Sequence, residues 1–320
     1  MLSLLREFRH QQSTDMRHKI FALVGLADPE ELKSYGMDYS CDITDVCFRY
    51  SVFQIMMTGT LDVLTAGCYE ARQHDTLGRW IPDWSQEASD CDTCYGFNHD
   101  QVPPHKPGTG FRVNLEIIGK GILLTGVVVD EVVEVVQKRI DINKFYDPTS
   151  EPWVMWKEFA MVETAANPYQ SPEGRYDSYW RTIMYDMDAT GARAKPELGK
   201  KFTEWSTGQG DNRIDVTGRI IFKYRRLFRT KRGLLGNDCS RVKVGDKVAV
   251  FHGARFPIVL REDADITGST AGINGRGADE TAVRGHLLIG GDSYIHGLCD
   301  GEAFKIAEEE GIEVEQICLL

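Results

Sequence analysis

The segment from Val242 to Leu260 alternates short apolar runs with turn residues, and this pattern constrains the fold more than any other feature. An apolar run leads into Gly245-Asp246, a dipeptide that suits a tight turn. Residues 247–250 then have the period of a half-buried strand, and a turn at 252–255 separates them from a second strand at 256–260. Short strands with turn chemistry at both ends predict the hairpin of a small antiparallel barrel or sandwich.

The first part of the chain has a different period. Residues 1–85 repeat apolar side chains at helical spacing, so they predict a helical region. Its clearest helix begins at Asp42 or Thr44, either of which can cap it, and ends at Gly59. A polar, Pro-containing loop follows at 86–109.

Residues 110–320 have mainly the period of strands, with one helical interruption. Aromatic stripes at 148–210 predict a helical insertion whose aromatic side chains form its core. Residues 262–285 are rich in Gly, Ala, Asp and Thr, so we expect a flexible loop there. The sequence therefore predicts an α+β fold, in which an N-terminal helical region precedes a small antiparallel β-barrel-like or sandwich-like domain carrying a helical insertion.

The charge and cysteine content restrict the partners and the compartment. The net charge of −11 argues against nucleic acid, because phosphate binding needs a clustered basic face. The one basic cluster, within 223–232, is expected to be a solvated strand edge. No apolar run reaches the roughly 18–20 residues that span a bilayer, so no membrane partner is expected. Eight cysteines without a signal peptide predict free thiols in the cytoplasm.

One cluster has the spacing of zinc ligands. Cys91, Cys94, His99 and His105 give the pattern C-x2-C-x4-H-x5-H. The alternative is a loop that is simply rich in polar residues, because no predicted secondary structure frames the four side chains. We therefore keep these residues as a weak zinc candidate and predict no cofactor.

The aromatic segment at 80–85 is a candidate binding site. Trp80 and Trp84 flank a Pro-Asp pair, in which Asp83 offers a hydrogen-bonding group. Two Trp side chains around such a pair predict a buried plug, and ligand stacking is the alternative because Trp serves both purposes.

A second candidate site follows the turn at Gly290–Asp292. Ser293 and His296 would point to opposite faces of a strand, so a direct Ser–His pair is not expected. The candidates for a polar pocket at the barrel mouth, beside a core-facing Tyr294, are His296, Asp300 and Glu302. No nucleophile elbow, phosphate loop or zinc-protease motif is present, and no catalytic residue is predicted.

Three separated segments resemble one protein family. Residues 14–27 read TDMRHKIFALVGLA and precede Asp38-Tyr39-Ser40; they resemble the "TDPRDKIYALLGLA … DYS" segment of fungal heterokaryon-incompatibility (HET-domain) proteins. Residues 80–85, WIPDWS, are similar to "SWVPDWS" of that family. The residues from Gly291 to Gly297, followed by 300–303, are similar to its "G-YVHGIMDGEA" ending.

The resemblance implies a fungal intracellular protein of self/non-self recognition, in which incompatible alleles trigger cell death after hyphal fusion. This chain departs from the family at His18, where Asp is usual, and at Asn237–Cys239, where a Gly-rich turn is usual. The HET domain proper, with the TIR-like part associated with toxicity, would lie upstream of Met1. The resemblance therefore carries over no catalytic residue.

These observations leave several functions open. The first hypothesis is a non-catalytic regulatory or recognition module that binds proteins, including a second copy of itself. The second is an enzyme of fungal secondary metabolism that holds an apolar small molecule in a pocket lined by Trp80, Trp84, Tyr294 and His296. The third is a nonfunctional gene fragment.

Overall fold

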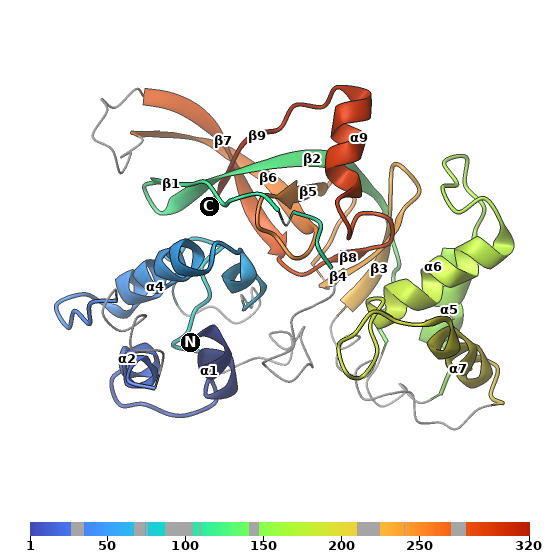
Figure 1. Cartoon of the computed structure of the whole chain (residues 1–320), viewed down its shortest axis with the longest axis horizontal. Coiled ribbons are helices and arrows are strands. Elements are labelled where there is room, and N and C mark those ends of the chain that lie inside the picture. Colours follow the sequence, from blue (N-terminus) through green and yellow to red (C-terminus); the bar gives the residue numbers. More distant parts are fainter. Residues whose placement is uncertain are drawn as a thin grey trace.

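The computed structural model describes residues 1–26, 35–66, 74, 76–86, 105–108, 110–140, 147–209, 225–239, 241–269 and 280–320 (Figure 1). For strand residues 264–269 and 280–283 only the backbone is described. These residues form an N-terminal group of helices, one nine-stranded sheet and a second group of helices, so the fold is α+β. None of the described helices combines the length and apolarity that a membrane crossing requires.

The N-terminal region is helical, as predicted. Its longest helix, α4 (Ile43–Thr58), begins where the Asp42 carboxylate accepts the backbone N–H of Asp45 at 2.9 Å. It ends where Gly59 adopts a left-handed φ of 64°. The shorter segments around it are α1 (Leu2–Glu7), α2 (His18–Val24) and the 3-10 helix η1 (Asp62–Ala66).

Five strands close into a barrel. They are β2 (Gly121–Val135), β5 (Lys247–Phe251), β6 (Ile258–Ser269), β7 (Glu280–Gly290) and β9 (Glu315–Leu319). Each pairs with the next, and β9 returns to β2. Gly126 marks the closure, because it pairs with Phe251 on one edge of β2 and with Glu315 on the other. The β7–β9 pairing is parallel, so the barrel is mixed rather than wholly antiparallel.

The long strand β2 is bent. Its register shifts between Val128 and Asp130 against β5, and again between Val132 and Glu134 against β3. Such bulges increase the local twist and bend a strand. Because β2 is bent, one part of it pairs within the barrel and its last residues pair with a neighbouring run of strands.

That neighbouring run extends the sheet beyond the ring. The last residues of β2 pair with β3 (Arg225–Thr230), followed by β4 (Leu235–Cys239) and β8 (Tyr294–Ile295). The first residues of β2 pair with β1 (Leu115–Ile118) through a hairpin. Helix α9 (Glu302–Glu310) lies against β2 (Figure 1).

The barrel and the N-terminal helices share one core. A single apolar cluster takes buried side chains from every ring strand and from the N-terminal helices. Its ring members include Leu124, Phe251, Leu260, Leu288 and Ile317. A separate cluster joins other side chains of β2 and β5 to α9, where Ala303 and Ala307 are buried.

The helical insertion forms a lobe beside β3 and β4 (Figure 1). It consists of α5 (Glu151–Met161), α6 (Pro172–Met184) and α7 (Pro196–Ser206). Trp153 and Trp205 pack edge to face with ring centres 4.9 Å apart, and Leu227 and Leu235 of the sheet complete this cluster. The prediction that the aromatic stripes form core is confirmed.

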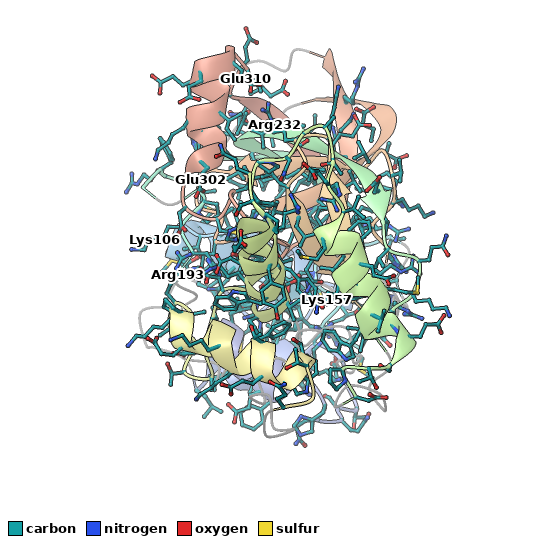
Figure 2. The ribbon with its side chains drawn as sticks, turned by 90° about the vertical axis from the view of Figure 1, so that its right-hand side faces the viewer. Lys106, Lys157, Arg193, Arg232, Glu302 and Glu310 are labelled. Atoms are coloured by element: carbon teal, nitrogen blue, oxygen red, sulfur yellow. The ribbon has the colours of Figure 1, made fainter. Side chains whose placement is uncertain are left out.

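The prediction that residues 223–232 form a solvated strand edge is wrong for the described part, which begins at Arg225. Strand β3 lies between β2 and β4, so it is not an edge strand. Arg225 and Arg229 point inward, are 2% and 4% exposed, and each pairs with a carboxylate. Arg232 reaches across to Glu310 at the end of α9, where its Nη1 donates to Oε1 at 2.6 Å (Figure 2).

One further prediction needs correction. The flexible loop expected over 262–285 is, in its described parts, a continuation of β6 and β7, which pair at positions such as Asp265 with Arg284. Backbone pairing extends a ladder even where side chains are small or polar. Residues 270–279 lie outside the described residues. The apolar run at 242–244 leads into the turn before β5, where Val244 is 65% exposed.

Candidate functional site

The aromatic segment at 80–85 supports the contact between the helical region and the barrel. Trp80 is fully buried and donates its indole N–H to the carbonyl oxygen of Lys120, in the β1–β2 turn, at 3.0 Å. Trp84 is 1% exposed, and its ring lies 4.9 Å from the guanidinium carbon of Arg9. Of the two alternatives for this segment, the described contacts are those of a buried plug.

Asp83 also makes structural contacts, and these hold the turn of the segment at 80–85. Its Oδ1 accepts the hydroxyl of Ser85 at 2.6 Å, and its carbonyl oxygen accepts Nη2 of Arg9 at 2.9 Å. Because it is 2% exposed, Asp83 is directed into the protein rather than toward a ligand.

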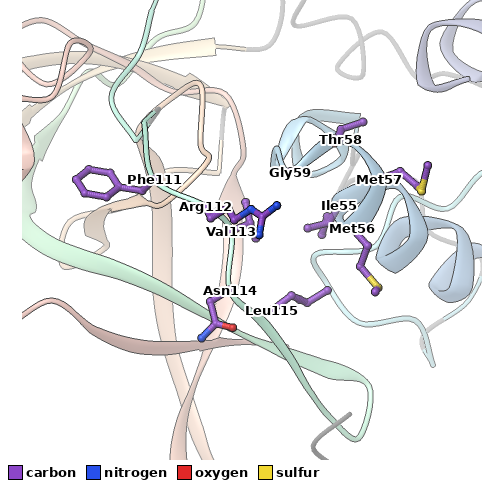
Figure 3. A pocket seen from close by; sticks show the side chains of 10 residues that line it. All are labelled: Ile55, Met56, Met57, Thr58, Gly59, Phe111, Arg112, Val113, Asn114 and Leu115. Atoms are coloured by element: carbon purple, nitrogen blue, oxygen red, sulfur yellow. The ribbon is translucent and has the colours of Figure 1, made fainter. Parts of the chain in front are cut away.

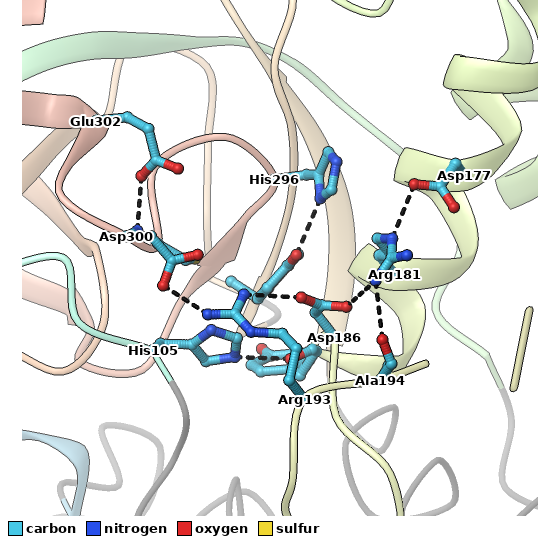
Figure 4. Close-up of polar contacts among 12 residues, drawn as sticks. His105, Asp177, Arg181, Asp186, Arg193, Ala194, His296, Asp300 and Glu302 are labelled. Carbon is cyan, nitrogen blue, oxygen red and sulfur yellow. Dashed lines mark hydrogen bonds and ion pairs between the residues drawn. The ribbon is translucent and has the colours of Figure 1, made fainter. Parts of the chain in front are cut away.

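Tyr294 and His296 form a hydrogen-bonded pair, in which His296 lies beside the helical insertion (Figure 4). The Tyr294 hydroxyl lies 3.0 Å from Nδ1 of His296. Burial lowers the pKa of His296 and raises the pKa of Tyr294 well above its ordinary value, so the bond joins two neutral groups. Tyr169 donates to the carbonyl oxygen of His296 at 3.1 Å. His296 is thus a satisfied histidine.

Asp300 and Glu302 join a chain of ion pairs at the same place (Figure 4). Glu302, in the first turn of α9, accepts the backbone N–H of Asp300 at 2.6 Å. The Asp300 carboxylate pairs with Arg193 at 2.6 Å, and Arg193 also pairs with Asp186 at 2.8 Å. Burial opposes the charge of Arg193, but hydrogen bonds to both carboxylates raise its pKa.

The chain of ion pairs continues into helix α6. Asp186 is 4% exposed and is shared by Arg193 and Arg181. Arg181 also donates to Asp177 at 2.8 Å and to the carbonyl oxygen of Ala194 at 3.2 Å. This arrangement fastens the helical insertion to the segment between β8 and α9.

His105 is the one zinc candidate that the structure describes; Cys91, Cys94 and His99 lie outside the described residues. Its Nε2 donates to the carbonyl oxygen of Tyr185 at 2.7 Å. Burial lowers the pKa of His105 to about 4, so the ring is neutral. No group of three His, Cys, Asp or Glu side chains suited to a metal occurs in the described part of the chain.

A buried polar network, not predicted from the sequence, lies below the turn at 290–293. Arg225 donates to Asp292 at 2.5 Å and to the Tyr185 hydroxyl. Ser293 donates to Asp238 at 2.6 Å. Burial raises the pKa of Asp238 to about 6, against the attraction of Arg225. Ser293 is therefore engaged with a carboxylate, and His296 is engaged elsewhere.

The pocket that was predicted from four aromatic residues is not formed. Trp80 and Trp84 belong to the cluster that fills the barrel and the N-terminal helices, whereas Tyr294 packs with Tyr185 and Phe256 in a separate cluster. No described contact connects the two groups. The spacing along the sequence carried no information about this separation.

A pocket of about 670 Å³ lies elsewhere, between the end of α4 and the segment that enters β1 (Figure 3). The α4 side contributes 55–59 and the other side contributes 111–115. The sequence held one signal for it: Met56 and Met57 are adjacent, and adjacent positions on a helix cannot both face one core.

Two comparisons with known proteins agree with the resemblance of the three segments. Residues 156–312 match the Het-6 beta-barrel domain. Over 137 residues the chain is 31% identical to heterokaryon incompatibility protein 6, OR allele, of Neurospora crassa. Both matches support a fungal protein of the heterokaryon-incompatibility family. No solved structure matches it.

The similarity to the heterokaryon-incompatibility relative is partial. It covers 42% of this chain and 17% of the relative. The matched domain runs from within α5 to the end of α9, so it includes the helical insertion and the ion-pair chain. Strands β1, β2 and β9 lie outside the matched residues, although β2 and β9 close the barrel of this chain.

Proposed function

We propose that the chain is a non-catalytic recognition module of a heterokaryon-incompatibility protein, which binds a protein partner and thereby contributes to self/non-self recognition and cell death. The observation that carries the proposal is the 31% identity to heterokaryon incompatibility protein 6 over 137 residues. Because that match covers 17% of the relative, the activity of the whole relative comes to this chain as a proposal only.

The use of polar residues supports binding rather than chemistry. Asp300, Arg193, Asp186 and Arg181 hold the helical insertion against the sheet, and Arg225 with Asp292 holds the turn above them. Such side chains give a rigid scaffold, and rigid scaffolds present the surface segments that recognise partners.

The distribution of charge supports a protein partner. The net charge is −11, and three arginines of the basic segment, Arg225, Arg229 and Arg232, are paired with Asp292, Glu134 and Glu310. Paired arginines do not offer the clustered basic face that a nucleic acid needs. The five described cysteines are free thiols, in keeping with a cytoplasmic location, which we also propose.

The proposal is tested by inducible expression of this chain in a panel of Neurospora crassa strains that differ in their incompatibility alleles. We expect growth arrest and uptake of a vital dye in some strains and not in others. Arrest in all strains would indicate general toxicity, and arrest in none would remove the proposed role. A Gly126→Val variant, which cannot close the barrel, serves as the unfolded control.

A further inference from the structure

The pocket between α4 and β1 is an exposed groove with an apolar floor. Met56 and Met57 lie on the α4 side of the groove and are 59% and 46% exposed, although the Met57 side chain points away from the segment 111–115 (Figure 3). Val113 and Leu115 are half-buried against the shared core, so they form the floor. Methionine is unbranched and polarizable, which lets it adapt to the side chains of a bound partner.

The backbone beside this groove is a free strand edge. Strand β1 pairs with β2 through Ile118 and Gly121, on either side of a two-residue turn in which Gly119 has a φ of 59°. Residues that flank such a turn form a hydrogen-bonded pair, and bonded and non-bonded pairs then alternate. Leu115 and Ile117 therefore direct their N–H and C=O groups away from β2. Within the described ranges no strand pairs with this edge.

The groove also carries one cation. Arg112 is exposed and makes no hydrogen bond or ion pair with the described residues. None of the described residues that line the groove is acidic. The neighbouring Phe111 stacks on His252 at 4.3 Å between ring centres and so anchors the segment to the barrel, pointing away from the groove (Figure 3). The groove is thus complementary to an apolar segment with a carboxylate.

We propose that this groove docks an extended segment of a partner protein, which adds as a strand to the outer edge of β1. Alternate apolar side chains of the segment lie on Met56 and Leu115, and one Asp or Glu pairs with Arg112. Strand addition draws affinity from backbone hydrogen bonds and specificity from alternate side chains. A second copy of the chain is a poorer occupant, because two copies of charge −11 repel each other. The identity of the partner rests on the proposed recognition role, whereas the groove is testable by itself.

The test uses a phage library of randomised linear ten-residue peptides, selected on the folded chain. We expect the enriched peptides to alternate apolar residues and to contain an acid. Their Kd should rise at least tenfold with Met56→Lys and with Arg112→Glu. Selection on the Arg112→Glu chain should replace the acid by Lys or Arg. The matched controls are Val154→Lys on α5 and Lys201→Glu on α7, both exposed and remote from the groove, which should leave the Kd unchanged.

Several outcomes would overturn the groove. One is the absence of any enriched peptide, and another is a set of peptides whose Kd is the same for the wild type and both groove variants. A third is a dimer in sedimentation that Met56→Lys dissociates, because the occupant would then be a second copy of the chain. The strain panel separates the two proposals. A chain that selects acidic peptides but arrests no strain keeps the groove and loses the recognition role. A chain that arrests selected strains but enriches no peptide loses the groove alone.

Discussion

The Arg225 guanidinium donates to the Asp292 carboxylate at 2.5 Å inside the protein, where the two side chains are only 2% and 6% exposed. A second carboxylate, Asp238, lies in the same network and receives the Ser293 hydroxyl. The guanidinium of Arg225 therefore offsets the negative charge of two buried carboxylates. The stability of the turn above β4 depends on that guanidinium more than on either acid.

Arg225→Met should destabilise the protein strongly, because it leaves Asp292 and Asp238 buried without a cation. Loss of one partner of a buried ion pair costs about 3–5 kcal/mol in the free energy of unfolding. Urea unfolding at pH 7.5 measures this change. Adding Asp292→Asn to the same chain should recover part of the loss, and a single-variant loss below about 1 kcal/mol would contradict the assignment.

His105 should make the protein sensitive to acid. Its pKa is about 4 in the folded state and 6.5 in the unfolded state, so the unfolded state binds the proton first. Stability is then present above the unfolded value and is lost as the pH falls from 6.5 toward 4. Between pH 7 and pH 5 the wild type should lose about 2 kcal/mol more than a His105→Phe variant.

The comparison with the variant is necessary because Asp238 acts in the opposite direction. Burial raises the pKa of this acid from 3.8 to about 6, so its contribution to stability falls as the pH rises through that interval. Urea unfolding of both proteins at several pH values isolates the histidine. Parallel pH profiles for wild type and variant would refute its role.

Gly126→Val should prevent closure of the barrel. A Cβ at this position would lie 2.6 Å from a ring carbon of Phe251 and 2.8 Å from the carbonyl oxygen of Val250. Since both neighbours belong to the core or the ladder, we expect a loss of several kcal/mol, of the order seen for overpacked cores, and poor recovery of folded protein. The control is Gly36→Ala, where nothing lies within 4 Å of the added Cβ. Equal thermal stability of the two variants would disprove the explanation.

Arg193→Gln should loosen the helical insertion, because this side chain bridges Asp300 and Asp186. Limited proteolysis with chymotrypsin should cut the insertion several-fold faster than in the wild type. Arg49→Gln is the matched control, since Arg49 pairs with Asp38 only at the surface, where an ion pair contributes little. Identical cleavage of all three proteins would indicate that packing alone holds the insertion.

The local elements could be predicted because their signals are local. The alternation at 247–250 and 256–260 corresponds to the pairing of β5 with β6, and Asp42 and Gly59 bound α4. The ring could not be predicted in this way. Apolar alternation identifies a strand, but it does not say that β9 pairs with β2 or that β7 runs parallel to β9.

At the candidate site, the burial of individual residues could be predicted better than which residues lie together. Tyr294 was expected to face the core, and it is buried there. Arg225 was misplaced because arginine is rarely buried unless it is paired, and its partner Asp292 is distant in sequence. Which distant side chains lie together depends on the tertiary structure and cannot be read from the sequence. For this reason Trp80 and Tyr294 were wrongly assigned to one pocket.

The closure of the ring by β9 has a consequence for synthesis on the ribosome. Thr125 of β2 and Gln316 of β9 are hydrogen-bonded but lie 191 residues apart in sequence. While the intervening chain is being made, one edge of β2 is without its partner, and open edges recruit other strands. Contacts at such separation also slow folding. A ribosome that stalls before Glu315 would therefore release an open sheet, so we expect this protein to need protection by chaperones until its last strand emerges.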